Sequence, residues 1–115
     1  MKLSEVAAIL EAEVLAGEES LSREAGSVFG SDMMSEVLAF SKEKAMLLTG
    51  LCNPQVIRTA ELIDVECIVF IRGKRPTEEM LEKAREDGIV VIASKFGMYH
   101  SCGKLYAAGL QDGCK

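Results

Sequence analysis

Three short apolar runs in the second half of the chain constrain the fold most strongly. They are Ala45–Thr49, Cys67–Ile71 and Ile89–Ala93, and their first residues are spaced by 22 positions each. None of them alternates apolar with polar residues, which is typical of strands buried on both faces of a parallel sheet. The last two are also rich in β-branched residues, which favours strands. We therefore expect three buried parallel strands.

A helical pattern follows each run. Asn53 is a suitable N-cap for a helix that begins at Pro54, and Thr77 is a suitable N-cap for the next helix, which Gly88 can end. A third helix is expected over residues 97–108. Right-handed crossovers place such strands side by side and the helices against the sheet. The pattern predicts the α/β class, as a layered sheet with mainly parallel strands in the second half and flanking helices.

The first half of the chain is less regular. It predicts a short helix over residues 5–10 with Ser4 as its cap, and strands over residues 13–16 and 25–29. Asp32 is expected to cap a further helix over residues 33–40. We expect the two early strands to form a sheet edge or a small side sheet. The length of 115 residues suits a single domain over residues 1–115.

Composition argues against several classes of function. The net charge of −5 disfavours non-specific nucleic-acid binding, and no apolar run approaches the roughly 20 residues of a membrane span. The acidic N-terminus does not suit a signal peptide, so we expect a cytoplasmic protein with reduced cysteines. One histidine, His100, and no C-x-x-C pair predict no metal site. Without a phosphate-binding loop or a catalytic triad, we expect neither an enzyme nor a cofactor.

The outgoing ends of the three expected strands form the candidate site. In an open parallel sheet, ligands bind beyond the carboxyl ends of the strands. Cations and a helix N-terminus there could hold a phosphate or carboxylate. The same residues also suit a structural role, with the glycines in tight turns and the cations in a solvated loop. The candidate ligand-binding residues are Thr49, Gly50, Asn53, Arg72, Gly73, Lys74, Ser94 and Lys95.

Cys52 and His100 leave alternatives open. Cys52 precedes the expected helix start, where a thiol can become reactive, but a lone cysteine also serves as a small hydrophobic residue. An enzyme that uses Cys52 would need a base, and none lies nearby in the sequence. His100 is expected at the surface or with its hydrogen bonds satisfied.

Five segments together match the pattern of a known family: residues 13–24, Leu47–Gly50, Asn53–Pro54, Cys67–Gly73 and Ile89–Lys95. Their order resembles the DRTGG domain family, which is similar to the N-terminal domain of HPr kinase/phosphorylase. The resemblance implies an α/β regulatory domain that self-associates or docks, with a homodimer expected. The first hypothesis is accordingly a non-catalytic regulatory or interaction module. The alternative is a sensor that binds a nucleotide or phosphorylated metabolite at the strand ends.

Overall fold

The computed structural model describes residues 1–114, which form a five-stranded sheet in the order β1-β5-β4-β3-β2. The three apolar runs are its central strands, β3 (Met46–Thr49), β4 (Cys67–Phe70) and β5 (Val90–Ala93). They are parallel and in register, with Met46 opposite Cys67 and Cys67 opposite Val90. Every residue of these strands is buried, which confirms the expectation from their unbroken apolar sequence.

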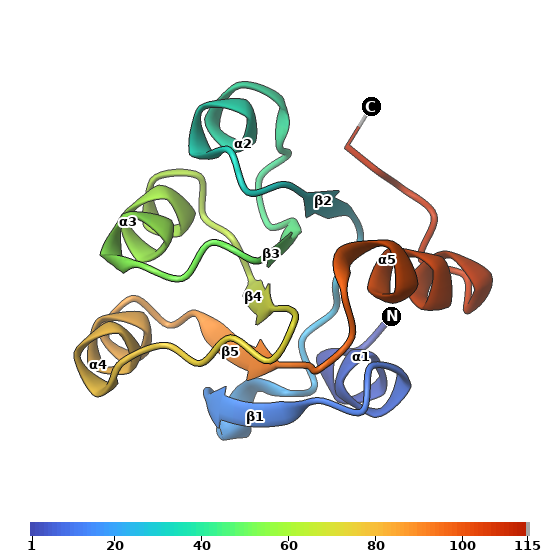
Figure 1. Ribbon diagram of the computed structural model, residues 1–115, viewed down its shortest axis with the longest axis horizontal. Coiled ribbons are helices and arrows are strands. Elements are labelled where there is room, and N and C mark those ends of the chain that lie inside the picture. The colour runs from blue at the N-terminus through green and yellow to red at the C-terminus, as the bar shows by residue number, and fades with distance from the viewer. Residues whose placement is uncertain (115) are drawn as a thin grey trace.

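The two early strands lie at opposite edges of this one sheet (Figure 1). β1 (Glu13–Ala16) pairs antiparallel with β5, and β2 (Val28–Gly30) pairs parallel with β3. The expected edge position is confirmed, and no separate side sheet forms among the described residues. β2 begins later than expected because the Ala25 N–H is already bonded to the Met1 carbonyl, at 2.7 Å.

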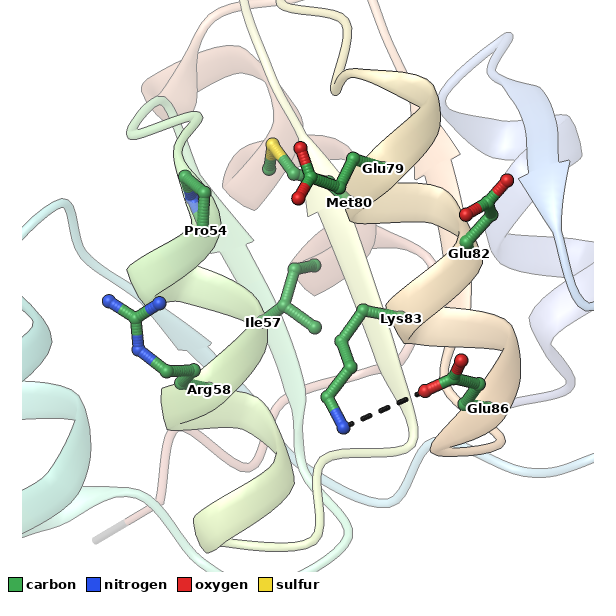
Figure 2. A pocket seen from close by; sticks show the side chains of 8 residues that line it. All are labelled: Pro54, Ile57, Arg58, Glu79, Met80, Glu82, Lys83 and Glu86. Carbon is green, nitrogen blue, oxygen red and sulfur yellow. Dashed lines mark ion pairs between the residues drawn. The ribbon is translucent and has the colours of Figure 1, made fainter.

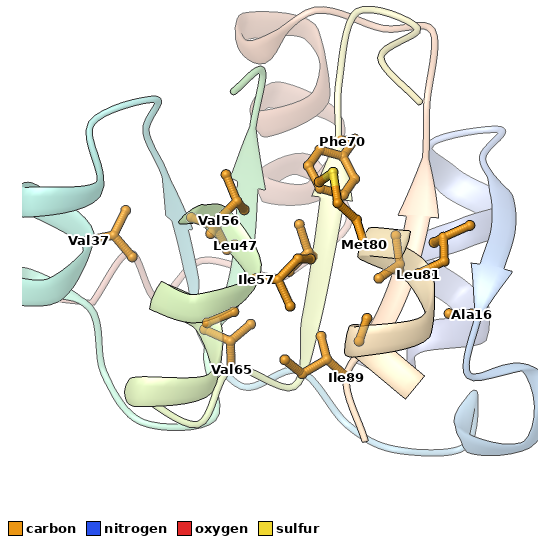
Figure 3. Close-up of a cluster of buried hydrophobic side chains, with 14 of the residues drawn as sticks. Ala16, Val37, Leu47, Val56, Ile57, Val65, Phe70, Met80, Leu81 and Ile89 are labelled. Atoms are coloured by element: carbon orange, nitrogen blue, oxygen red, sulfur yellow. The ribbon is translucent and has the colours of Figure 1, made fainter. Parts of the chain in front are cut away.

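Helices cover both faces of the sheet (Figure 1). α2 (Met34–Phe40), α3 (Pro54–Leu62) and α4 (Glu78–Glu86) cover one face, and the cluster beneath them includes Leu47 and Phe70 (Figure 3). α1 (Leu3–Ile9) and α5 (Met98–Ala107) cover the other, where the cluster includes Met46, Leu48 and Val69. Neighbouring strand residues thus point to opposite layers, as the pleat requires. A short 3₁₀ turn, η1 (Glu18–Ser20), follows β1.

The cap residues of α3 and α4 behave as predicted. Asn53 Oδ1 accepts a hydrogen bond from the Gln55 N–H at 2.9 Å, and Thr77 Oγ1 accepts one from the Met80 N–H at 3.2 Å. Gly88 follows α4 with a φ of +70°, which a glycine adopts without strain.

Two predicted caps were wrong. α1 starts at Leu3 with Lys2 in the N-cap position instead of Ser4, because the Leu3 and Ser4 N–H groups bond to backbone carbonyls of the segment after η1. Asp32 does not cap α2. Met33 is in the N-cap position and no side chain caps the helix. The Ser31 hydroxyl accepts a hydrogen bond from the Met33 N–H just before the helix, at 3.0 Å, and the Asp32 side chain bonds to Gly50 instead. No helix in the described residues is long and apolar enough to span a membrane.

Candidate functional site

The candidate residues follow the ends of three neighbouring parallel strands, so the sheet brings them to one border. Thr49 ends β3 and Gly50 follows it, Arg72 to Lys74 follow β4, and Ser94 and Lys95 follow β5. We call this border the strand-end rim. The prediction that the outgoing loops converge is confirmed by the pairing of β3 with β4 and of β4 with β5.

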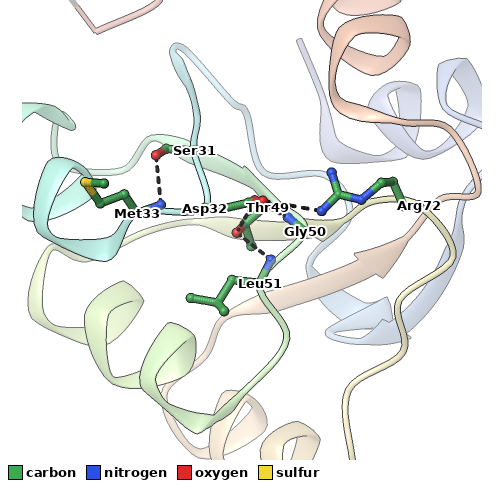
Figure 4. Close-up of polar contacts among 7 residues, drawn as sticks. All are labelled: Ser31, Asp32, Met33, Thr49, Gly50, Leu51 and Arg72. Atoms are coloured by element: carbon green, nitrogen blue, oxygen red, sulfur yellow. Dashed lines mark hydrogen bonds and ion pairs between the residues drawn. The ribbon is translucent and has the colours of Figure 1, made fainter.

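A carboxylate that the sequence did not predict lies in the rim (Figure 4). Asp32 Oδ1 accepts hydrogen bonds from the Gly50 N–H at 2.6 Å and from the Thr49 hydroxyl at 3.3 Å. Asp32 Oδ2 pairs with Arg72 Nη2 at 3.3 Å. The Gly50 N–H first, and then the Arg72 guanidinium, lower the pKa of Asp32. This carboxylate is therefore held in its charged form by donors from two strand ends.

Arg72 reaches Asp32 from an unusual backbone position. Its φ is +58°, and Gly73 follows at +72°, so the chain turns back after β4 with Lys74 N–H bonded to the Ile71 carbonyl. Few residues other than glycine adopt a positive φ, and the strain costs of order 1 kcal/mol. The Arg72 guanidinium lies where a side chain at position 50 would begin. Gly50 has no positive φ, so the glycine provides room for Arg72 and is not required by a turn.

Besides Gly50 and Arg72, which bond to Asp32, three of the candidate residues are engaged within the protein. Ser94 Oγ is buried, donates to the Leu10 carbonyl at 2.8 Å and accepts from the Phe96 N–H at 3.2 Å. Thr49 is buried and bonded to Asp32 and to the Leu51 N–H, and Asn53 caps α3. The side chains that remain exposed at the rim are the cations Arg72, Lys74 and Lys95.

The rim divides into two parts. Thr49, Gly50 and Arg72 gather around Asp32, beside β3. Gly73, Ser94 and Lys95 line a separate hollow of about 220 Å³ beside β1 and β5, together with Glu11, Glu13, Arg75 and Ala93. Arg75 closes one side of this hollow with two hydrogen bonds to the Glu13 carboxylate, at 3.0 and 3.2 Å, which lower the pKa of Glu13.

A further groove of about 360 Å³ runs between α3 and α4 (Figure 2). Its walls are mostly charged. Lys83 of α4 reaches across to Glu61 of α3, at 3.8 Å, and it also pairs with Asp87 at 3.3 Å and Glu86 at 3.9 Å on its own side. No group of side chains suited to hold a metal ion occurs among residues 1–114. The residues that line the groove are Pro54, Ile57, Arg58, Glu79, Met80, Glu82, Lys83 and Glu86.

Cys52 and His100 are the two residues whose roles the sequence left open. Partial burial raises the pKa of the Cys52 thiol, with Lys74 acting in the opposite direction, so less thiolate forms at neutral pH. His100 is exposed on α5 and its ring lies 4.6 Å from that of Phe96. Neither observation points to a nucleophile with its base.

Comparison with known proteins identifies the family of this sequence. The family model described as "DRTGG domain" matches the sequence over residues 5–108. The chain belongs to the DRTGG domain family. Its fold is similar to a crystal structure of the CBS and DRTGG domains of the regulatory region of Clostridium perfringens pyrophosphatase, which was determined with the activator diadenosine tetraphosphate.

That similarity has a TM-score of 0.72 at 19% sequence identity, over 90% of this chain and 45% of the other. The DRTGG chain thus spans less than half of the pyrophosphatase region. The shared fold confirms the α/β class, and the family match confirms the DRTGG resemblance inferred from the sequence. A comparison with curated proteins gave no match.

Proposed function

We propose that this DRTGG chain is a single-domain, non-catalytic regulatory module that acts as a homodimer through the outward face of α5. The observation that supports the proposal is the exposure of aromatic side chains along this helix. Tyr99 is 95% exposed and Tyr106 is 60% exposed, although tyrosine is usually at least half buried in a folded protein. A continuous exposed apolar face is typical of an interaction site.

The spacing along α5 suits contact with another helix. One stripe on this helix is formed by residues at intervals of three and four positions, namely Tyr99, Gly103, Tyr106 and Ala107. Gly103 has no neighbour within 4 Å of the position that a Cβ would occupy. An interior helical glycine costs about 1 kcal/mol relative to alanine, and nothing within the chain offsets this cost. A second α5 that approaches closely over Gly103, flanked by the tyrosines, would offset it.

Size-exclusion chromatography with light scattering tests the proposal. The protein is expected to elute as a dimer at high micromolar concentration, with twice the 12.5 kDa mass of one chain. Tyr106→Glu would place a charge in the contact and is expected to give a monomer. Leu62→Glu is the matched control, because Leu62 is 75% exposed on α3 at the other face of the sheet. A strictly monomeric wild-type protein would contradict the proposal.

The rim supports a second candidate function, a sensor of a nucleotide or phosphorylated metabolite. Three exposed cations, Arg72, Lys74 and Lys95, stand beyond the strand ends, where α/β sheets bind ligands. The pyrophosphatase region of similar fold was crystallised with a dinucleotide activator, which makes nucleotides the first ligands to test here.

A thermal-shift panel of nucleotides and sugar phosphates tests the sensor. A ligand that binds the native state raises the melting temperature, and Arg72→Ala together with Lys95→Ala should abolish the rise. Arg58→Ala removes an exposed cation from α3 instead and should leave the response unchanged. If no compound in the panel raises the melting temperature of the wild-type protein, the sensor function is excluded.

A further inference from the structure

The Asp32 carboxylate occupies a set of hydrogen-bond donors that would suit a separate anion. The Gly50 N–H, the Thr49 hydroxyl and the Arg72 guanidinium converge on it at 2.6, 3.3 and 3.3 Å. Two of these donors belong to the end of β3 and the third to the turn after β4. Hydrogen bonds between such donors and a charged oxygen are among the stronger ones in proteins.

The two donors at the end of β3 are buried, whereas the acceptor lies on a loop. Thr49 and Gly50 are buried and continue the central sheet, and the missing Cβ of Gly50 leaves the space that the Arg72 guanidinium fills. Asp32 lies in the connection between β2 and α2, and its side chain is 50% exposed. A buried N–H such as that of Gly50 needs an acceptor, but the acceptor need not be Asp32.

We propose that this donor set is an oxyanion site whose resident occupant is the chain's own Asp32, and that the carboxylate or phosphate group of a ligand binds by displacing it. This inference rests on the proposed sensor function and adds to it a built-in competitor. The competitor sets a threshold, because a tethered carboxylate is present at a high effective concentration that a free anion must exceed.

Displacement of Asp32 would also have a structural consequence. Asp32 stands two residues before α2, and α2 with its flanking residue carries three exposed apolar side chains, Met33, Leu38 and Phe40. The ion pair and hydrogen bonds of Asp32 tie the start of this helix to β3 and β4. An anion that took its place would free the loop and link occupancy of the rim to the position of α2.

Chemical rescue tests the proposal. In Asp32→Ala the Gly50 N–H loses its acceptor, so the melting temperature is expected to fall, and sodium formate or inorganic phosphate should raise it again in a saturable manner relative to sodium chloride. The apparent affinity for these anions should be at least about tenfold tighter than in the wild-type protein.

The control is Glu13→Ala, which removes an exposed carboxylate that is paired with Arg75 and accepts no backbone N–H. This variant should show no rescue. Rescue by formate alone assigns the site to carboxylates, and rescue by phosphate alone assigns it to phosphates.

A second measurement does not depend on the folding of Asp32→Ala. In the wild-type protein, a phosphate or formate titration at high concentration should shift the NMR signal of the Gly50 amide, and Arg72→Ala should remove the shift. The absence of both the rescue and the shift would overturn the proposal. Equal rescue of Glu13→Ala would overturn it as well. If nucleotides bound the wild-type protein and Asp32→Ala equally well, the sensor function would stand and the competition would be refuted. If formate rescued Asp32→Ala while no nucleotide or sugar phosphate bound, the oxyanion site would stand without the sensor function.

Discussion

Gly103→Ala should change the stability of the monomer and of the dimer in opposite directions. In the monomer, the added methyl group meets nothing within 4 Å and only removes the cost of a helical glycine. That cost is about 1 kcal/mol, which corresponds to a rise in melting temperature of roughly 4 °C for a domain of this size.

In the proposed dimer, the same methyl group enters the closest point of contact between the two α5 helices. Overpacking of a close contact costs about 1–3 kcal/mol, and every 1.4 kcal/mol changes a dissociation constant by about tenfold. The dissociation constant of the dimer should therefore rise by about tenfold or more, even though each chain becomes more stable.

Melting curves and light scattering over a range of protein concentrations separate the two effects. At low concentration, where chains are monomeric, Gly103→Ala should melt above the wild type, and this advantage should shrink or reverse as the concentration increases. Gly26→Ala is the control, because Gly26 is a loop residue with equally open surroundings. An unchanged dissociation constant together with the same stabilisation at all concentrations would refute a close contact at Gly103.

Three further predictions concern the fold and the rim. Gly17→Ala should lower the free energy of unfolding by about 2–4 kcal/mol in urea titrations. Gly17 has a φ of +84°, and an added Cβ would lie 2.8 Å from Val90 Cγ2 and 3.0 Å from Val90 Cα. A loss below about 1 kcal/mol would show that β1 and β5 separate easily. Because the pKa of Asp32 is lowered, the stability that its carboxylate contributes is present above the ordinary value of 3.8 and is lost as the pH falls through the folded-state pKa. The difference in stability between wild type and Asp32→Asn should therefore narrow in acid titrations. A difference that is constant with pH would argue against the charged network. Burial raises the pKa of Cys67, so a thiol reagent should modify Cys67 only after unfolding, and rapid modification in the native protein would contradict its place in the core.

The central fold was predictable because its determinants are local in the sequence. The strands β3, β4 and β5 are short unbroken apolar runs, and the caps Asn53 and Thr77 bond to residues two and three positions further along. The position of the rim followed from parallel pairing alone, since all outgoing loops of a parallel sheet lie at one border. The cations Arg72, Lys74 and Lys95 lie at this border, and their binding of a ligand stays a prediction.

The role of Asp32 was not predictable because its partners are distant in the sequence. Gly50 lies 18 positions away and Arg72 lies 40 positions away. The local pattern of Asp32 before a helix favours a cap, but the helix begins one residue later, with Met33 in the N-cap position and no side chain capping it. The positive φ of Arg72 gave no sequence signal either, although the glycine that follows it marked a turn. The division of the rim into two parts depends on such long-range contacts.

The most direct test of self-association through α5 is an isotope-filtered NMR experiment on a mixture of labelled and unlabelled protein, in which only contacts between different chains give signals. The Tyr99 and Tyr106 rings of one copy should give contacts to Gly103 and Ala107 of the other. Intermolecular signals confined to the exposed residues of α2 and α3, or no such signals at high micromolar concentration, would contradict the proposal.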